Sequence, residues 1–346
     1  MPPIQTYLKP LLSRCMGAWL MMTPIHAHAE LIVLASPTAA DNYYASEADK
    51  IFDFHIAYAK QILTHDEVLI FTDQSYYADY VAELGQERVR IAPMADIWMR
   101  DFTTANPIQP VMFRYSAAGQ GGGREGQESA DLVQEQFYQT IKPAGLPFRE
   151  TDLINDGGNV VDDGDGNMVV SRKFLRDNRL SEQAARKQLQ KLTGARHIAF
   201  IEADEQGGLE HADGVVSFIG PNRVMINSYP EDPNYAKQLR HDLESALPGV
   251  TIHTIITPYD GSETMDARFG SACGLYTNAL VTPERIYFPQ FGIPEDATAL
   301  KQVRSFTDKE VVPVSSQQVC HMGGGVRCMS WQLRGESAQR LLKHHP

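Results

Sequence analysis

The sequence predicts a mixed α/β fold in which five similar helix-and-strand units are arranged radially around one central site. Segments with helical spacing alternate with short β-type runs along the chain. Each unit reaches a polar or glycine-rich run, and residues suited to chemistry recur there at intervals of 50 to 67 residues. These marker residues are Asp101, Gly158, His211, Asn278 and Cys328. A doubly wound sheet also alternates helices and strands, but it explains less readily why such residues stand at the same point of all five units.

Five segments have the spacing of amphipathic helices, with apolar residues three or four positions apart. Ser181 is a predicted N-cap and Gly194 a predicted stop for the third helix, while Asp232 followed by Pro233 marks the start of the fourth. The predicted helices span residues 47–63, 128–142, 181–193, 232–247 and 295–304.

Short β-type runs follow these helices, at residues 67–71, 196–201 and 250–256 among others. The polar or glycine-rich runs come next, at residues 97–101, 156–159, 211–214, 275–278 and 323–328. Residues 162–167 are rich in aspartate and glycine, but the sequence lacks the glycine and glutamate that complete a calcium loop. That segment is therefore predicted to be a tight hairpin turn.

Composition favours a soluble globular protein, because 43% of the 346 residues are hydrophobic and 21% are charged. The formal net charge of -12 argues against binding to nucleic acid or to an anionic membrane surface, and it suits a cationic substrate. No apolar segment has the roughly 20 residues that span a bilayer. The sequence also lacks phosphate-binding, dinucleotide-binding and zinc-type motifs, so no metal and no cofactor is expected.

Residues 1–29 are predicted to be a signal peptide. Lys9 and Arg14 supply positive charge, residues 16–22 are mostly apolar, and Ala27-His28-Ala29 fits a small-x-small cleavage pattern. A disordered amphipathic leader or a misassigned start is the alternative. One catalytic domain is expected over residues 30–340, in a periplasmic or secreted protein.

Removal of the leader leaves three cysteines, an odd number for an oxidising compartment. We expect a disulfide between Cys273 and Cys320 and a free thiol at Cys328. The alternative is that Cys273 and Cys320 are both buried thiols.

Cys328 is the candidate nucleophile, because it ends a glycine-rich segment in which the backbone can approach a ligand closely. The adjacent Arg327 is expected to favour the reactive thiolate. A structural cysteine is the alternative on this segment alone.

His211 and Asp213 are two residues apart, so in a strand they would face the same side. Histidine can transfer protons near neutral pH. Asp101 would add a second carboxylate, and two carboxylates can hold the planar guanidinium group from different edges. The alternatives are a surface loop pair for His211 and Asp213, and a salt bridge to Arg100 for Asp101.

Together these segments resemble the family of agmatine deiminases and Porphyromonas-type peptidylarginine deiminases, over about residues 30 to 335. Each motif is weak alone, but all five occur in the family's order. The matching segments are Trp98 to Asp101, Gly157 to Gly166, His211 to Asp213, Tyr276 to Asn278 with Pro289 to Gly292 beyond it, and Gly323 to Cys328.

The resemblance implies the pentein fold, a five-fold pseudosymmetric α/β propeller. It implies that Cys328 attacks the guanidinium carbon, that His211 is the general acid and base, and that Asp101 and Asp213 hold the guanidinium nitrogens. Asn278 matches an asparagine that supports the site in the peptidylarginine branch. Ammonia would leave from a covalent adduct, and water would release a ureido product without a cofactor. The expected substrate-binding residues are Trp98, Asp156, Gly158 and Asn159.

Three departures from the family pattern concern the substrate. Phe102 to Thr104 stand where the family usually has a Gly-Pro pair, Asp156 replaces the glutamate of agmatine enzymes, and Arg327 replaces a histidine. We expect an extracytoplasmic arginine derivative, with peptidyl arginine ahead of agmatine, because agmatine breakdown for putrescine biosynthesis is usually cytosolic. An amidinotransferase, a non-enzymatic guanidine binder and a cysteine protease are the alternatives. The protease hypothesis leaves the two aspartates without a role.

Overall fold

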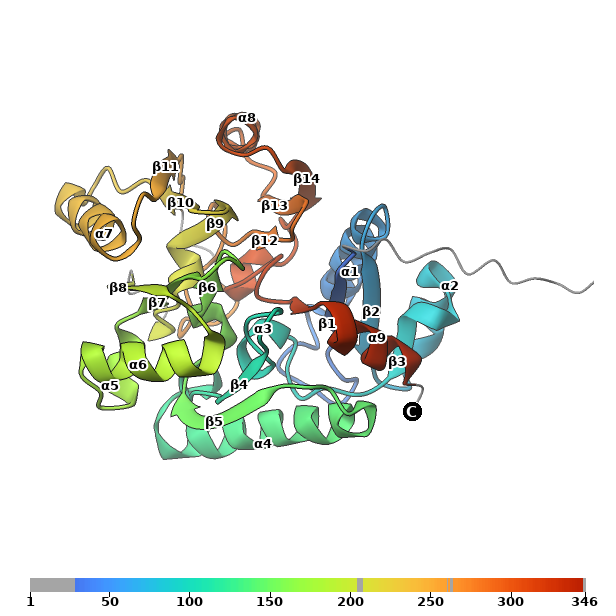
Figure 1. Cartoon of the computed structure of the whole chain (residues 1–346). Helices are drawn as coiled ribbons and strands as arrows, with labels where there is room; N and C mark the ends of the chain where they lie inside the picture. The colour runs from blue at the N-terminus through green and yellow to red at the C-terminus, as the bar shows by residue number, and fades with distance from the viewer. Residues whose placement is uncertain (1–28, 204–207, 260, 262–263, 345–346) are drawn as a thin grey trace, which may run out of the picture.

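A three-strand motif recurs along the chain in the computed structural model, which describes residues 29–203, 208–259, 261 and 264–344. In four copies a central strand pairs antiparallel with one neighbour and parallel with the other (Figure 1). In a fifth copy the antiparallel partner is reduced to one bridge, between Ala105 and Val111. The described strands therefore form five separate sheets with related connectivity.

In the four complete motifs the antiparallel, central and parallel strands are, respectively, β15 (Trp331–Leu333), β1 (Leu31–Ala35) and β2 (Glu67–Thr72); β6 (Val161–Asp162), β7 (Asn167–Ser171) and β8 (His197–Ile201); β9 (Val216–Gly220), β10 (Arg223–Asn227) and β11 (Thr251–Ile255); and β12 (Leu280–Val281), β13 (Arg285–Gln290) and β14 (Glu310–Ser315). The fifth motif contains β4 (Val111–Arg114) and β5 (Arg149–Ile154), and β3 (Val89–Ile91) extends the first sheet.

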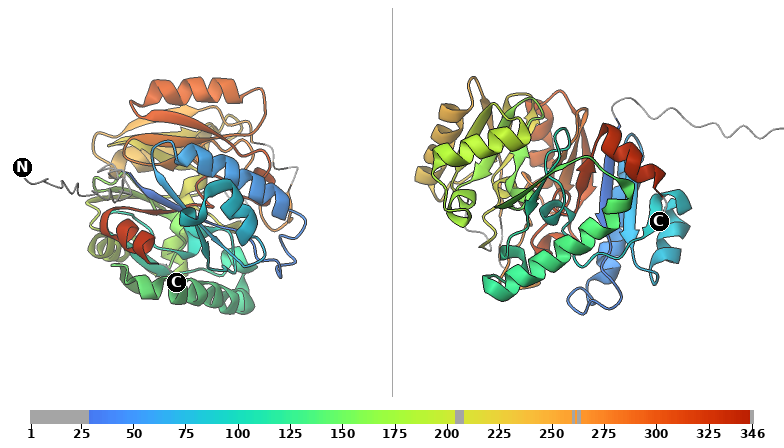
Figure 2. Two further views of the ribbon diagram at one scale, coloured as in Figure 1. Left: turned by 90° about the vertical axis from the view of Figure 1, so that its right-hand side faces the viewer. Right: turned by 60° about the horizontal axis from the view of Figure 1, so that its bottom comes forward.

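A long helix connects the central strand of each motif to its parallel strand. These helices are α1 (Ala48–Ile62), α4 (Gly123–Ile141), α6 (Glu182–Thr193), α7 (Pro233–Ala246) and α8 (Asp296–Phe306). They lie on the outside of the molecule, around the strands (Figures 1 and 2). The shorter helices are α2 (Tyr77–Leu84), α3 (Met99–Phe102), α5 (Lys173–Asp177) and α9 (Gly335–Lys343).

All five predicted helices are present, and the predicted caps are confirmed. The side chain of Ser181 accepts a hydrogen bond from the amide of Ala184, and that of Asp232 accepts one from the amide of Tyr235. Gly194 ends α6 with a φ of 74°, a left-handed conformation that favours glycine. Helix α4 begins five residues earlier than predicted, at Gly123, because the glycine-rich start of this helix carries no apolar periodicity.

The other local predictions agree with the strands. The β-type runs at residues 67–71, 196–201 and 250–256 form β2, β8 and β11 within a residue at each end. The segment at residues 162–167 is a hairpin turn between the antiparallel strands β6 and β7. Residues 1–28 of the predicted signal peptide lie outside the described residues. None of the helices that the structure describes is long and apolar enough to cross a membrane.

The core joins neighbouring motifs to one another. Alternate residues of β1 contribute to two hydrophobic clusters: Ile32 and Leu34 to one, Leu31 and Val33 to the other. Both faces of this strand are therefore covered, as expected for a sheet that carries helices. The polar segment before each antiparallel strand, or before the Ala105 bridge, is held between such packed units.

Candidate active site

One cavity of about 320 Å³ collects the residues that the sequence singles out. Cys328, His211, Asp213, Asp101 and Asn278 all line it, and so does Trp98. Each comes from a segment that precedes an antiparallel strand or the equivalent bridge. The recurring motif therefore brings residues that are distant in the sequence to one point.

Cys328 is almost fully buried, and its sulfur accepts a hydrogen bond from Nδ2 of Asn278 at 3.1 Å. The Arg100 amide donates to the Cys328 carbonyl at 3.0 Å, which ties the Asp101 segment to the cysteine segment. Burial raises the pKa of the Cys328 thiol well above its usual value, and the charges of Asp213 and Asp101 add to this effect. The resting nucleophile is therefore a thiol at neutral pH.

Arg327 makes contacts that the sequence did not suggest. Its Nε donates to Oδ2 of Asp213 at 3.1 Å, and its Nη2 donates to the carbonyl of Val160 at 2.9 Å. The predicted role in favouring the Cys328 thiolate gains no support from this geometry. Arg327 instead holds the carboxylate of Asp213 at the wall of the cavity.

His211 lies between two carboxylates. Its Nε2 is 2.8 Å from Oδ2 of Asp156, and its Nδ1 is 3.7 Å from Oδ1 of Asp101. Burial alone lowers the pKa of His211, but Asp101 and Asp156 outweigh it and raise the pKa to about 9. Burial raises the pKa of Asp101 to about 7, although the charge of His211 opposes this. The imidazole is therefore protonated at neutral pH, beside a carboxyl group that titrates near neutrality.

The local structure around His211 differs from the prediction. His211 and Asp213 were expected in a strand, but His211 precedes a 3₁₀ turn at Ala212–Gly214 and β9 begins only at Val216. Both side chains still reach the cavity, because the turn projects them from one tight bend. Asp101 likewise lies on α3, and its side chain makes no ion pair with Arg100 among the contacts of the described residues.

Gly158 provides space for the charged groups. A Cβ atom built on this glycine would lie 2.6 Å from Nδ1 of His211 and 2.8 Å from Oδ1 of Asp101. The Gly158 amide donates to the same Asp101 oxygen at 3.1 Å. Gly158 thus lets the chain pass next to the pair and orients one carboxylate.

Asp156 and Asn159, which were expected to bind substrate, lie behind the cavity wall. Asp156 contacts His211, whose charge and hydrogen bond lower the pKa of Asp156 although burial opposes this. Oδ1 of Asn159 accepts from the amides of Ser171 and Ala212, at 2.8 and 3.2 Å. These two residues therefore support the segment that carries His211.

The far end of the cavity contains residues that no sequence pattern indicated. Asp96 accepts hydrogen bonds from Tyr44 Oη at 3.0 Å, from the Ile97 amide at 2.7 Å and from Gln120 Nε2 at 2.7 Å. Burial raises the pKa of Asp96 to about 6. The glycine-rich segment around Gln120 was the only available signal, and it gave no indication of which residue it contacts.

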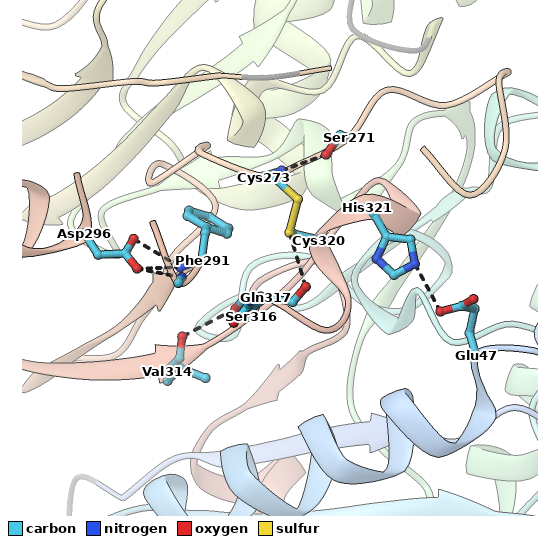
Figure 3. Close-up of a disulfide and its surroundings, with 11 residues drawn as sticks. Glu47, Ser271, Cys273, Phe291, Asp296, Val314, Ser316, Gln317, Cys320 and His321 are labelled. Carbon is cyan, nitrogen blue, oxygen red and sulfur yellow. Dashed lines mark hydrogen bonds and ion pairs between the residues drawn. A yellow bond between two sulfur atoms is a disulfide. The ribbon is translucent and has the colours of Figure 1, made fainter. Parts of the chain in front are cut away.

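A disulfide fixes one wall of the cavity (Figure 3). Cys273 and Cys320 are bonded, as predicted, and Cys328 is the free cysteine among the described residues. The amide of Ala272 donates to the Cys320 carbonyl at 2.8 Å, and residues 268–272 line the cavity. The bridge therefore joins that wall to the segment leading to Cys328.

No group of three or more His, Cys, Asp or Glu side chains in the described ranges has the arrangement of a metal site. The chemistry available to the cavity is thus that of a thiol, a protonated imidazole and carboxylates. Two carboxylates, Asp101 and Asp213, face a ligand with charge, and Trp98 offers an aromatic surface.

Known proteins share this sequence and this fold. Agmatine deiminase of Stutzerimonas stutzeri (strain A1501) is 23% identical over 344 residues, covering 86% of this chain and 90% of its own. Agmatine deiminase of Pseudomonas aeruginosa (strain LESB58) is 23% identical over 318 residues, covering 80% and 85%. The solved agmatine deiminase of Enterococcus faecalis superposes with a TM-score of 0.71 at 20% identity, covering 90% of this chain and 94% of that one.

These similarities extend over most of the molecule. The agmatine deiminase of C. jejuni also has a TM-score of 0.71, at 16% identity, and covers 90% of this chain. The chain shares the mixed α/β fold of these pentein-family structures. The family model for Porphyromonas-type peptidyl-arginine deiminase matches residues 21–333. This protein therefore belongs to the Porphyromonas-type peptidyl-arginine deiminase family.

Proposed function

We propose that the protein hydrolyses the guanidinium group of an arginine derivative to a ureido group and ammonia. One observation carries the proposal: a single cavity holds the thiol of Cys328, the protonated imidazole of His211 and the carboxylates of Asp101 and Asp213. These are the groups needed to bind a planar cation, attack its carbon and protonate the nitrogen that leaves.

Substrate recognition rests on charge. A guanidinium group carries five N–H donors, and carboxylates on two sides can accept from different edges of it. Arg327 and the Gly158 amide keep the two carboxylates in place without a substrate. Little reorganisation is then needed when the cation enters, which favours catalysis by positioning.

Substrate binding also activates the nucleophile. The negative charges of Asp213 and Asp101 help to keep Cys328 protonated in the empty site. A guanidinium bound between them offsets those charges, so the thiol proton is released to water and the thiolate forms beside the carbon it attacks.

The first half of the reaction forms a covalent adduct. The thiolate adds to the guanidinium carbon, and protonated His211 donates its proton to one amino group. The carbon–nitrogen bond breaks, ammonia leaves, and a thiouronium group remains on Cys328. The hydrogen bond from Asn278 to the sulfur orients the nucleophile for this attack.

The second half uses neutral His211 as a base. The contact between Nε2 and Asp156 favours the tautomer with the proton on Nε2, which leaves the Nδ1 lone pair available. Nδ1 takes a proton from water as its oxygen adds to the thiouronium carbon. The carbon–sulfur bond then breaks, which releases the ureido product and restores the thiolate and the protonated imidazole.

A five-fold pseudosymmetric propeller is the architecture that best fits this chemistry. The five sheets repeat one connectivity, and the segment before each antiparallel strand or bridge carries a site residue or a residue that supports one. Such repetition supports a closed arrangement of five units around one centre. We further propose that the protein is exported, on the basis of the predicted leader.

For the substrate, we favour peptidyl arginine over agmatine. Agmatine ends in an ammonium group, which needs an acceptor, whereas a peptide presents neutral amides. Asp96 at the far end already accepts three hydrogen bonds, which makes it a weaker acceptor for an ammonium group. A mismatch at that end leaves polar groups unpaired and can make discrimination large.

An assay of ureido product and ammonia with agmatine, free arginine and arginine-containing peptides tests both levels of the proposal. Turnover of any of them supports deimination, and no turnover of any guanidine contradicts it. A kcat/KM for agmatine more than about tenfold above that for peptides, about 1.4 kcal/mol, contradicts the preferred substrate alone. Adding an amine acceptor to the same assay detects amidino transfer, and tight binding without product would indicate a guanidine binder.

A further inference from the structure

The carboxylate of Asp156 is held by a residue that takes no part in the chemistry described above. Asp156 is 2% exposed, so its contacts lie inside the protein. The Ser116 amide donates to Oδ1 at 2.8 Å, and the Ser116 hydroxyl donates to Oδ2 at 2.7 Å. Oδ2 also meets Nε2 of His211 at 2.8 Å. One carboxylate oxygen is thus shared between the serine and the histidine.

Ser116 is itself fixed by the chain around it. It follows β4 and is 2% exposed, and its hydroxyl oxygen accepts from the Ala118 amide at 3.3 Å. The neighbouring Tyr115 amide donates to Gln134 of α4 at 3.1 Å. Ser116 therefore presents both donors from an anchored backbone.

The length of Asp156 explains why such a clamp is needed. The sequence has aspartate where the agmatine enzymes that it resembles have glutamate, so this carboxylate reaches one methylene less far. A buried carboxylate with His211 as its single partner could turn about its side-chain torsions. Two further hydrogen bonds, one on each oxygen, leave it a single orientation.

We propose that Ser116 is a positioning residue for deimination: it fixes Asp156 so that Asp156 holds His211 with Nδ1 directed toward the substrate. The proposal rests on the proposed function. It assigns Ser116 no contact with the substrate, because neither Ser116 nor Asp156 lines the cavity that contains Cys328.

The effect of Ser116 is expected on turnover and not on binding. The charged and titratable groups that act on or near Asp156 are His211, Lys173, Asp101 and Tyr115. His211 and Lys173 remain when the hydroxyl is removed, and they keep the Asp156 carboxylate ionised at neutral pH. Loss of the hydroxyl therefore loosens the orientation of the carboxylate while its charge persists.

Ser116→Ala tests this, with Ser171→Ala as the matched control, because Ser171 is fully buried and its hydroxyl has no hydrogen-bond partner. We expect kcat of Ser116→Ala to fall about tenfold or more, as for loss of a hydrogen bond to a charged group, with KM changed less than about twofold. The control should keep both constants within about twofold. An unchanged kcat, or a rise in KM alone, overturns the proposal.

Two further variants separate positioning from packing. Ser116→Cys nearly keeps the volume but donates more weakly, so its kcat should lie between wild type and Ser116→Ala. Full activity of Ser116→Cys overturns the proposal. In an Asp156→Ala background, Ser116→Ala should change kcat less than about threefold, because the carboxylate to be held is gone. A full tenfold effect there contradicts action through Asp156.

Wild-type activity is measured first in every series. If the wild type releases no ureido product, the proposed function fails and no conclusion about Ser116 is drawn from kinetics. If the wild type turns over and the variants behave like the control, only the role of Ser116 fails. Thermal melting of each variant shows that a lost kcat is not lost folding.

Discussion

Gly158→Ala is expected to disrupt the site with little disturbance of the backbone. Gly158 is not among the glycines with positive φ, so the backbone tolerates alanine. The new Cβ would lie 2.6 Å from Nδ1 of His211, 2.8 Å from Oδ1 of Asp101 and 3.2 Å from Oδ2 of Asp213. The imidazole nitrogen must retreat by about 0.8 Å to reach an ordinary contact of 3.4 Å.

A displacement of this size affects the groups that bind and protonate the substrate. A misplacement of about 1 Å can cost about a hundredfold in rate, and overpacking typically costs about 1–3 kcal/mol of stability. We therefore expect kcat/KM for Gly158→Ala to fall about a hundredfold, or about 2.7 kcal/mol, while the protein still folds.

The assay is steady-state ureido formation, together with a thermal melt. The control is Gly220→Ala, because a Cβ at Gly220 would meet only Arg223, at 3.8 Å or more. If folded Gly158→Ala keeps kcat/KM within about fivefold of wild type, the three charged groups do not need the close approach at Gly158.

Three other outcomes are expected. Asp101→Asn and Asp213→Asn should each lower kcat/KM by more than about a hundredfold, because each replaces a charged acceptor for a cation; a tenfold loss or less would remove that residue from the site. The pKa of His211 is raised to about 9, so its acid form persists below that value, and kcat/KM should fall about tenfold per pH unit above it. A profile that stays flat to pH 10 would contradict this assignment. Thiol counting on unreduced, denatured mature protein should find one thiol, and reducing the Cys273–Cys320 bridge, which spans 47 residues, should cost up to about 4 kcal/mol; three thiols would refute the bridge.

Much of the fold could be predicted, because its signals are local. Helical periodicity, the caps at Ser181 and Asp232 and the alternation of helices with strands are all read over a few residues. The start of α4 was missed because Gly121 to Gly123 carry no such signal. The antiparallel contact at Ala105 is one bridge long, too short for any strand pattern.

The candidate site was predictable only as a set of residue types. Spacing along the chain indicated that Asp101, His211 and Cys328 meet, but it could not give the direction of each side chain. Asp156 and Arg327 were expected to contact substrate or sulfur, and they contact His211 and Asp213 instead. Ser116 carries no motif at all, since its role depends on a partner 40 residues away that only folding brings near.

Cys328→Ala provides the most direct test of covalent deimination. Purified wild-type protein should convert a guanidine substrate to ureido product and ammonia in equal amounts. The variant should keep its fold and its melting temperature but lose about a thousandfold or more in kcat, because the nucleophile is gone. Activity of the variant within threefold of wild type would contradict a nucleophilic role for Cys328 and the mechanism built on it.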